Sequence, residues 1–161
     1  MYFWKIENLK QDIITPKFSE KDRFIYAFIY ISLSVIMIEA LTYISVLSVE
    51  EFNIWDNINS ITNIIIPIVG TFYAYKMNGG SQGNDFLGKF FSINFVVSIR
   101  FLALLVPLFL LLFFYYSIMV NEEESLQSSP IEIIPFQIWY ILLYVRTCKH
   151  IRDVRNSQPG D

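Results

Sequence analysis

Four long apolar runs constrain this chain more than any other feature of its sequence. They cover approximately residues 20–49, 57–76, 88–120 and 131–148. A helix needs about 20 mostly apolar residues to cross the hydrocarbon core of a bilayer, and each run approaches or exceeds that length. Outside these runs, the chain of 161 residues has too little polar sequence to cover four such helices in water. We therefore predict an all-α polytopic membrane protein, a four-transmembrane-helix bundle in a single membrane domain of residues 1–161.

The composition agrees with a membrane protein and argues against several other classes. Hydrophobic residues make up 54% of the chain and charged residues 17%, with a mean hydropathy of +0.44. Soluble proteins carry about 25% charged residues. A net charge of −3 argues against binding to nucleic acid. One cysteine and one histidine are too few for a disulfide framework or a zinc cage, so we expect no metal and no cofactor.

The positive charges predict how the chain is oriented in the membrane. Five of the 12 Lys and Arg residues precede Phe24, where the apolar stretch of the first run begins, two flank the connection between the second and third runs, and four follow Val145, where the last apolar stretch ends. The connections at 50–56 and 121–130 carry acidic residues and no Lys or Arg. The positive-inside rule then places both termini and the connection around residue 80 in the cytoplasm. The Ile- and Asn-rich composition favours a bacterial source, and hence the inner membrane.

The first 18 residues have a helical pattern of their own. Apolar residues recur at near-helical spacing from Tyr2 to Ile14, with polar residues between them. Such a segment can lie flat at the cytoplasmic interface, with Trp4 at the level of the headgroups. We favour a role in anchoring the first span or packing beneath the bundle over a regulatory or partner-binding role. The first span itself is predicted to begin at an N-cap formed by Ser19 and Asp22.

Two charged residues lie far from the ends of the runs, Glu39 in the first and Arg100 in the third. Charges at this depth are costly and usually face a partner or a cavity. The two spans are parallel in the predicted topology, so an ion pair that joins them is our favoured interpretation. A second interpretation has Arg100 reach the cytoplasmic interface while Glu39 is protonated. A third has Glu39 bind a proton or cation during transport.

Other polar residues share helical faces inside the runs. Thr42 and Tyr43 lie within about 60° of Glu39 on the first span. A stripe of small and amide residues follows one face of the second span: Asp56, Asn59, Asn63, Pro67, Gly70 and Ala74. Small residues allow helices to approach closely in lipid, and amides hydrogen-bond between helices. We favour helix packing for this stripe over a broken helix beside a binding cavity.

Two cytoplasmic segments stand out. The connection around residue 80 contains four glycines, at positions 79, 80, 83 and 88, but has neither a phosphate-loop nor a dinucleotide pattern. A tight turn at the membrane surface is favoured there over a ligand-binding loop. In the basic tail, residues 149–161, and the turn before it, positive residues recur at every third position: Arg146, Lys149, Arg152 and Arg155. This ridge is suited to contact anionic lipid headgroups. Cys148 and His150 are expected to be incidental polar surface.

The sequence contains no constellation typical of an enzyme. It has no cysteine pair, and a lone histidine outside the apolar runs gives their serines no general base. We therefore expect a small, non-enzymatic integral membrane protein that acts by binding or assembly, of the immunity or accessory type. Its expected partners are the lipid bilayer and either itself or another membrane protein, not nucleic acid. The alternative is a small oligomeric ion channel or proton-coupled transporter that uses Glu39. A channel needs a continuous polar lining, whereas a binding protein buries its polar residues between its own helices.

Overall fold

The computed structural model describes residues 1–15, 17–46, 53–119 and 129–158, with the backbone alone described at residues 35, 38–46 and 119. Within these ranges the chain is all-helical, as predicted. The helices are α1 (Ile6–Ile14), α2 (Glu20–Val46), α3 (Ile54–Met77), the 3-10 turn η1 (Gly80–Gln82), α4 (Phe86–Met119) and α5 (Pro130–Ser157). Among the described residues α3, α4 and α5 are long and apolar enough to cross a membrane, by length and composition. The first predicted run corresponds to α2.

Side chains that bond back to the backbone define where the long helices begin. At the start of α2, the backbone N–H of Asp22 donates to Ser19 Oγ (3.2 Å), and the N–H of Ser19 donates to Asp22 Oδ2 (3.1 Å). Asn53 and Asp56 form the same reciprocal capping box at the start of α3. Such boxes satisfy backbone donors that a helix leaves free in its first turn. The predicted N-cap of the first span is therefore present.

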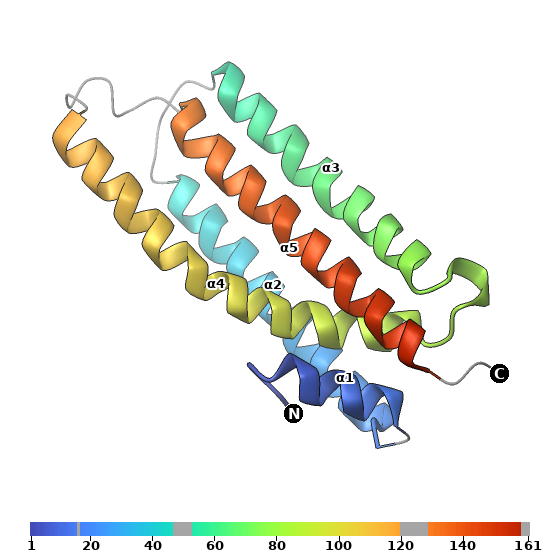
Figure 1. Ribbon diagram of the computed structural model, residues 1–161. Helices are drawn as coiled ribbons and strands as arrows, with labels where there is room; N and C mark the ends of the chain where they lie inside the picture. Colours follow the sequence, from blue (N-terminus) through green and yellow to red (C-terminus); the bar gives the residue numbers. More distant parts are fainter. Residues whose placement is uncertain (16, 47–52, 120–128, 159–161) are drawn as a thin grey trace.

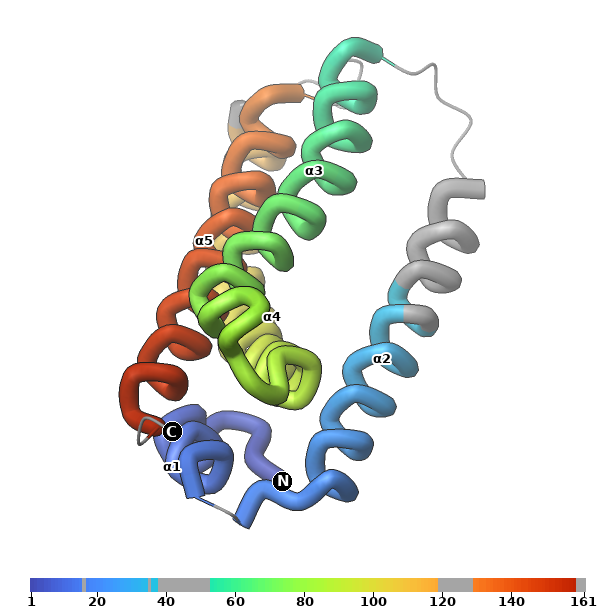
Figure 2. The backbone as a smooth tube through the Cα atoms, turned by 90° about the vertical axis from the view of Figure 1, so that its right-hand side faces the viewer, coloured from blue at the N-terminus to red at the C-terminus, as the bar shows by residue number. Residues whose placement is uncertain are grey.

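The four long helices form an open row in the order α3, α5, α4, α2. Each packs against its neighbour in this order, and α1 packs across the ends of α4 and α5. Figure 1 shows the long helices side by side with α1 beneath one end, and Figure 2 shows α2 standing away from α3. The described residues thus form a curved layer of helices, and the four-transmembrane-helix bundle stays a prediction.

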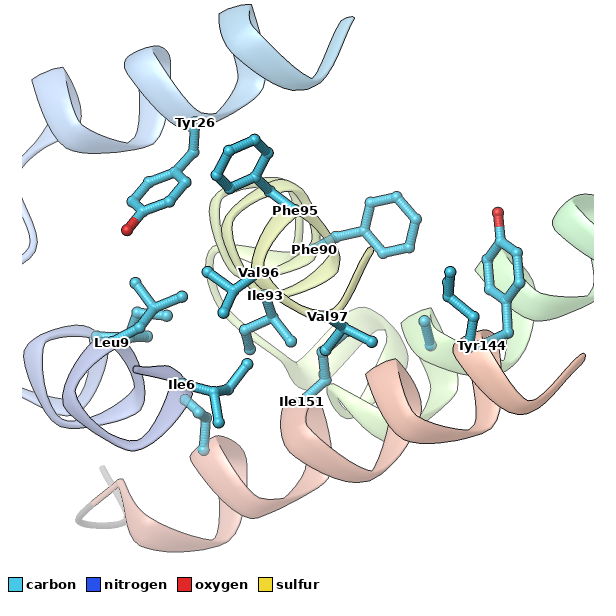
Figure 3. Packing of buried hydrophobic residues seen from close by; sticks show 14 of the residues in the cluster. Ile6, Leu9, Tyr26, Phe90, Ile93, Phe95, Val96, Val97, Tyr144 and Ile151 are labelled. Atoms are coloured by element: carbon cyan, nitrogen blue, oxygen red, sulfur yellow. The ribbon is translucent and has the colours of Figure 1, made fainter. Parts of the chain in front are cut away.

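The core of the molecule lies at the end where α1 sits. Figure 3 shows side chains from four helices meeting there: Ile6 and Leu9 of α1, Tyr26 of α2, Ile93 and Val96 of α4, and Ile151 of α5. Farther along the helices, large apolar side chains face outward, with Leu111 68% and Ile118 73% exposed. Soluble proteins rarely expose apolar surface on this scale, whereas lipid is a suitable solvent for it. The fold therefore combines a packed end with a long, apolar body.

The basic segments of the chain meet at this packed end. Lys10 Nζ of α1 lies 3.2 Å from Asp153 Oδ2 in the last turns of α5. The turn between α3 and α4 lies beside Arg155, and the first residues of the chain and the last turn of α5 lie on this side of the molecule (Figures 1 and 2). Residues 149–157 of the predicted tail continue α5 without a break. The fold thus gathers the N-terminal segment, the glycine-rich turn and the basic tail at one end.

Candidate functional site

Arg100 reaches from α4 to the N-terminal segment. Its Nε donates a hydrogen bond to the Trp4 carbonyl oxygen (2.8 Å), Nη2 donates to the same oxygen, and the guanidinium lies 5.7 Å from the centre of the Trp4 ring. Arg100 thus extends toward the end of the molecule where α1 lies. The side chains of Glu39, Thr42 and Tyr43 lie outside the described residues, so the Glu39–Arg100 ion pair stays a prediction.

The N-terminal segment is held by hydrogen bonds of its own. The Tyr2 backbone N–H donates to the Tyr26 hydroxyl (2.6 Å), which in turn donates to the Tyr2 carbonyl (3.2 Å). The Tyr2 hydroxyl donates to Asp12 Oδ2 (2.8 Å), and this bond raises the pKa of Tyr2 because the carboxylate stabilises the protonated phenol. Residues 1–14 therefore pack beneath the row of helices, whereas their place at a membrane interface stays a prediction.

Asn59 and Asn63 of α3 belong to an amide cluster with a third member, Gln137 of α5. Gln137 Nε2 donates to Asn59 Oδ1 (2.6 Å) and to Asn63 Oδ1 (3.1 Å), and Asn63 Nδ2 donates to Asn59 Oδ1 (3.3 Å). Gln137 was not among the residues predicted from the sequence. Its position along the helix could have indicated this role. The helices α3 and α5 run in the same direction, and Gln137 lies about as far into α5 as Asn59 and Asn63 lie into α3.

Gly70, farther along the small-residue stripe on α3, also faces α5. A Cβ atom on Gly70 would overlap the Tyr144 ring, and Cys148 Sγ lies 3.8 Å from the Gly70 carbonyl oxygen. Ala74, one turn farther, is completely buried. The glycine thus lets an aromatic ring of α5 lie directly against the backbone of α3, as expected of small residues at a helix interface in lipid. The helix continues through Pro67 without interruption.

A second polar connection joins three helices near the core. Asn94 of α4 donates from Nδ2 to the Tyr30 hydroxyl of α2 (2.9 Å), and Thr147 of α5 donates to Asn94 Oδ1 (3.0 Å). Asn94 and Thr147 are almost fully buried. Buried polar groups are costly unless they are paired, and here each one finds its partner on a neighbouring helix of the same chain.

The most enclosed charge among the described residues is Lys89, which is 1% exposed. Its ammonium donates to three neutral amide oxygens: Asn84 Oδ1 (2.9 Å), Gln158 Oε1 (3.0 Å) and Asn78 Oδ1 (3.2 Å). Three donors therefore meet three acceptors, which satisfies the hydrogen-bonding capacity of the group. The three amide side chains form a cage around the Lys89 ammonium, and this cage ties the turn between α3 and α4 to the end of α5. In the sequence, Lys89 serves only as one of the positive charges that predict the orientation of the chain in the membrane.

The glycines in this turn and at the start of α4 allow the chain to approach itself closely around the cage. Gly79 adopts φ 106° and Gly80 φ 60°, in the left-handed region that favours glycine. A Cβ on Gly83 would overlap the Asn78 carbonyl, and one on Gly88 would lie 2.5 Å from Asp85 Oδ1. Close backbone approach therefore accounts for the glycine-rich sequence, in agreement with the favoured tight turn.

Cys148 and His150 occupy other places than the sequence analysis expected. His150 is 3% exposed, and neither ring nitrogen has a hydrogen-bond partner among the described residues. Its Nδ1 lies 4.0 Å from Asp153 Oδ2. Cys148 is half-buried against α3. Both residues belong to helix contacts, because α5 continues as a packed helix where an exposed tail was expected.

A groove of about 650 Å³ runs between α3 and α5. Apolar side chains from Ile65 to Met77 of α3 and from Ile141 to Cys148 of α5 form most of its walls. At the end near α1 the lining changes to Lys149 and Arg152. The structure therefore divides the predicted basic ridge, since Lys149 and Arg152 line this groove and Arg146 and Arg155 do not.

The described residues form only a few kinds of potential binding site. No group of three or more His, Cys, Asp or Glu side chains suited to a metal comes together within the described ranges. The sites are amide clusters between helices, a caged ammonium and an apolar groove with a basic end. Comparison with known protein families, curated proteins and solved structures finds no match to this chain.

Proposed function

We propose that this chain is a small, non-enzymatic integral membrane protein that acts by binding or assembly, of the immunity or accessory type. Three helices with the length and composition of membrane spans support the membrane location. We propose α2 as the fourth span, because the 27 residues of this helix include the long apolar run that follows Phe24.

The proposed orientation has both termini and η1 in the cytoplasm, in a bacterial inner membrane. The positive-inside rule supports this orientation, because the fold gathers the basic segments of the chain at one end. In this orientation the core around α1 lies at the cytoplasmic surface, and α1 lies at the membrane interface. The opposite ends of the helices reach the outer surface.

The observation that carries the binding role is where the polar groups of the long helices point. Asn94 and Thr147 are buried and bond to side chains of neighbouring helices, and Gln137 joins Asn59 and Asn63. A conducting pore needs such groups along a shared wet axis, whereas a binding protein uses them to hold its helices together. The open row leaves α2 and α3 as edges where a second copy or another membrane protein can pack.

Reconstitution into liposomes tests this function. The purified full-length chain should show no proton or potassium flux above that of empty liposomes, and Glu39→Gln should leave this result unchanged. A mass measurement in mild detergent gives the number of copies in the assembly. Cation or proton flux that is lost in Glu39→Gln would contradict the binding role and establish the alternative, a channel or transporter that uses Glu39.

A further inference from the structure

The groove between α3 and α5 has an apolar body and one charged end, both built from described residues. Its body follows α3 from Ile65 to Met77 and α5 from Ile141 to Cys148. The rise from Ile65 to Met77, twelve residues farther along α3, is about 18 Å along the helix axis. One leaflet of a bilayer contributes about half of the hydrocarbon core, or roughly 15 Å. The groove is therefore about as long as one leaflet is thick.

The charged end is positive and lacks a carboxylate of its own. Lys149 and Arg152 are exposed and line the groove, and neither makes an ion pair with another described residue. The neighbouring carboxylate, Asp153, already faces Lys10 at 3.2 Å. Two cations at the mouth of an apolar channel are complementary to a ligand with an anionic head and an apolar tail.

A tyrosine marks the transition between the two parts. Tyr73 lines the groove one helical turn before Met77 and is 53% exposed. Tyrosine prefers the headgroup level of a bilayer, where its ring meets apolar chains and its hydroxyl meets polar groups. In the proposed orientation this level faces the cytoplasm. The volume of about 650 Å³ also falls in the range of small-molecule sites.

We propose that this groove binds one anionic phospholipid of the cytoplasmic leaflet. An acyl chain lies along the apolar walls between α3 and α5, and the phosphate group contacts Lys149 and Arg152. The inference deepens the proposed binding role and rests on its orientation in the membrane. Gly70 and Tyr144 form part of the floor, so the contact between the two helices shapes the site.

Native mass spectrometry of the full-length chain in mild detergent tests the charged end. The probes are phosphatidylglycerol and phosphatidylcholine with identical acyl chains. We expect one bound phosphatidylglycerol per chain and weaker retention of phosphatidylcholine. Lys149→Gln with Arg152→Gln should weaken phosphatidylglycerol binding about thirtyfold, since each basic residue near an anionic surface contributes a roughly fivefold effect. The matched control, Lys17→Gln with Lys21→Gln, removes the same charge from exposed positions outside the groove and should change binding less than twofold.

A second pair of variants tests the apolar body. Val69→Trp places a large ring in the groove and should reduce retention of both lipids, whereas Ile64→Trp adds the same ring outside the groove and should not. Equal retention of the two lipids, equal effects of the two charge pairs, or equal effects of the two tryptophans would overturn the proposal. If any of these results is obtained and the liposomes show no flux, the lipid site is contradicted and the proposed function is not. Glu39-dependent flux contradicts the proposed function whatever the lipid result.

Discussion

Lys89 fixes the geometry of the turn between α3 and α4 through neutral partners. Burial of a charge is costly unless hydrogen bonds replace the lost water, and three amide oxygens do so here. The partners come from the end of α3, from the turn and from the residue after α5. One ammonium therefore holds three segments that are distant in sequence, and the bonds depend on the close approach that Gly83 permits.

Lys89→Met should destabilise the protein by about 2–3 kcal/mol, because it leaves the buried Asn78 side-chain oxygen without this donor and removes two further hydrogen bonds. Thermal unfolding in detergent, followed by circular dichroism, measures the change. Lys76→Met is the control, since Lys76 is exposed, and it should shift stability by no more than about 0.5 kcal/mol. Equal stability of the two variants would show that the cage is not a stabilising element.

Gly70 provides a second prediction at the scale of single residues. Gly70→Ala should lower stability by about 1–3 kcal/mol, because the added methyl overlaps the Tyr144 ring. Tyr144→Leu in the same chain should recover part of that loss, and a double-mutant cycle measures the coupling. Additive effects in the cycle would mean that the two residues do not share a contact.

At the scale of elements, α1 is a packed part of the fold. Leu9 is completely buried, and Ile6 and Ile13 lie beside it in the core. The amphipathic pattern of residues 1–18 predicts a helix with one apolar face, and the structure shows that this face packs on α4 and α5. The polar face carries Lys10, which reaches Asp153 of α5.

Leu9→Ala should release α1 from the other helices, since truncation of a buried leucine costs about 2–5 kcal/mol. Hydrogen exchange measured by mass spectrometry should then rise strongly in residues 6–14 and little in α3. Gln11→Ala, at an exposed position of the same helix, serves as the control. Unchanged exchange in α1 of the Leu9 variant would contradict the packed arrangement.

Local patterns predicted the elements well and their partners poorly. Apolar run length located α3, α4 and α5, and Ser19 with Asp22 located the start of α2. The stripe that contains Gly70 predicted a contact face, but only the fold shows that α5 covers it. The cage of Lys89 and the burial of His150 depend on segments far apart in the chain, so no local spacing reveals them.

At the scale of the whole molecule, two surroundings divide the fold. The end near α1 has a buried core and interlocked polar groups, whereas the remaining lengths of the helices expose apolar side chains. α4 has 34 residues, or about 51 Å, and so exceeds a hydrocarbon core of about 30 Å. In the proposed orientation the packed end projects into the cytoplasm, and the apolar body is solvated by lipid.

Site-directed cysteine labelling tests this account most directly. In a Cys148→Ser background, single cysteines at Lys17, Ser125 and Ser157 are exposed to a membrane-impermeant maleimide on intact cells. The account predicts labelling of Ser125→Cys alone, with Lys17→Cys and Ser157→Cys labelled only after the cells are opened. Labelling of either terminal position on intact cells would contradict the four-span topology with cytoplasmic termini.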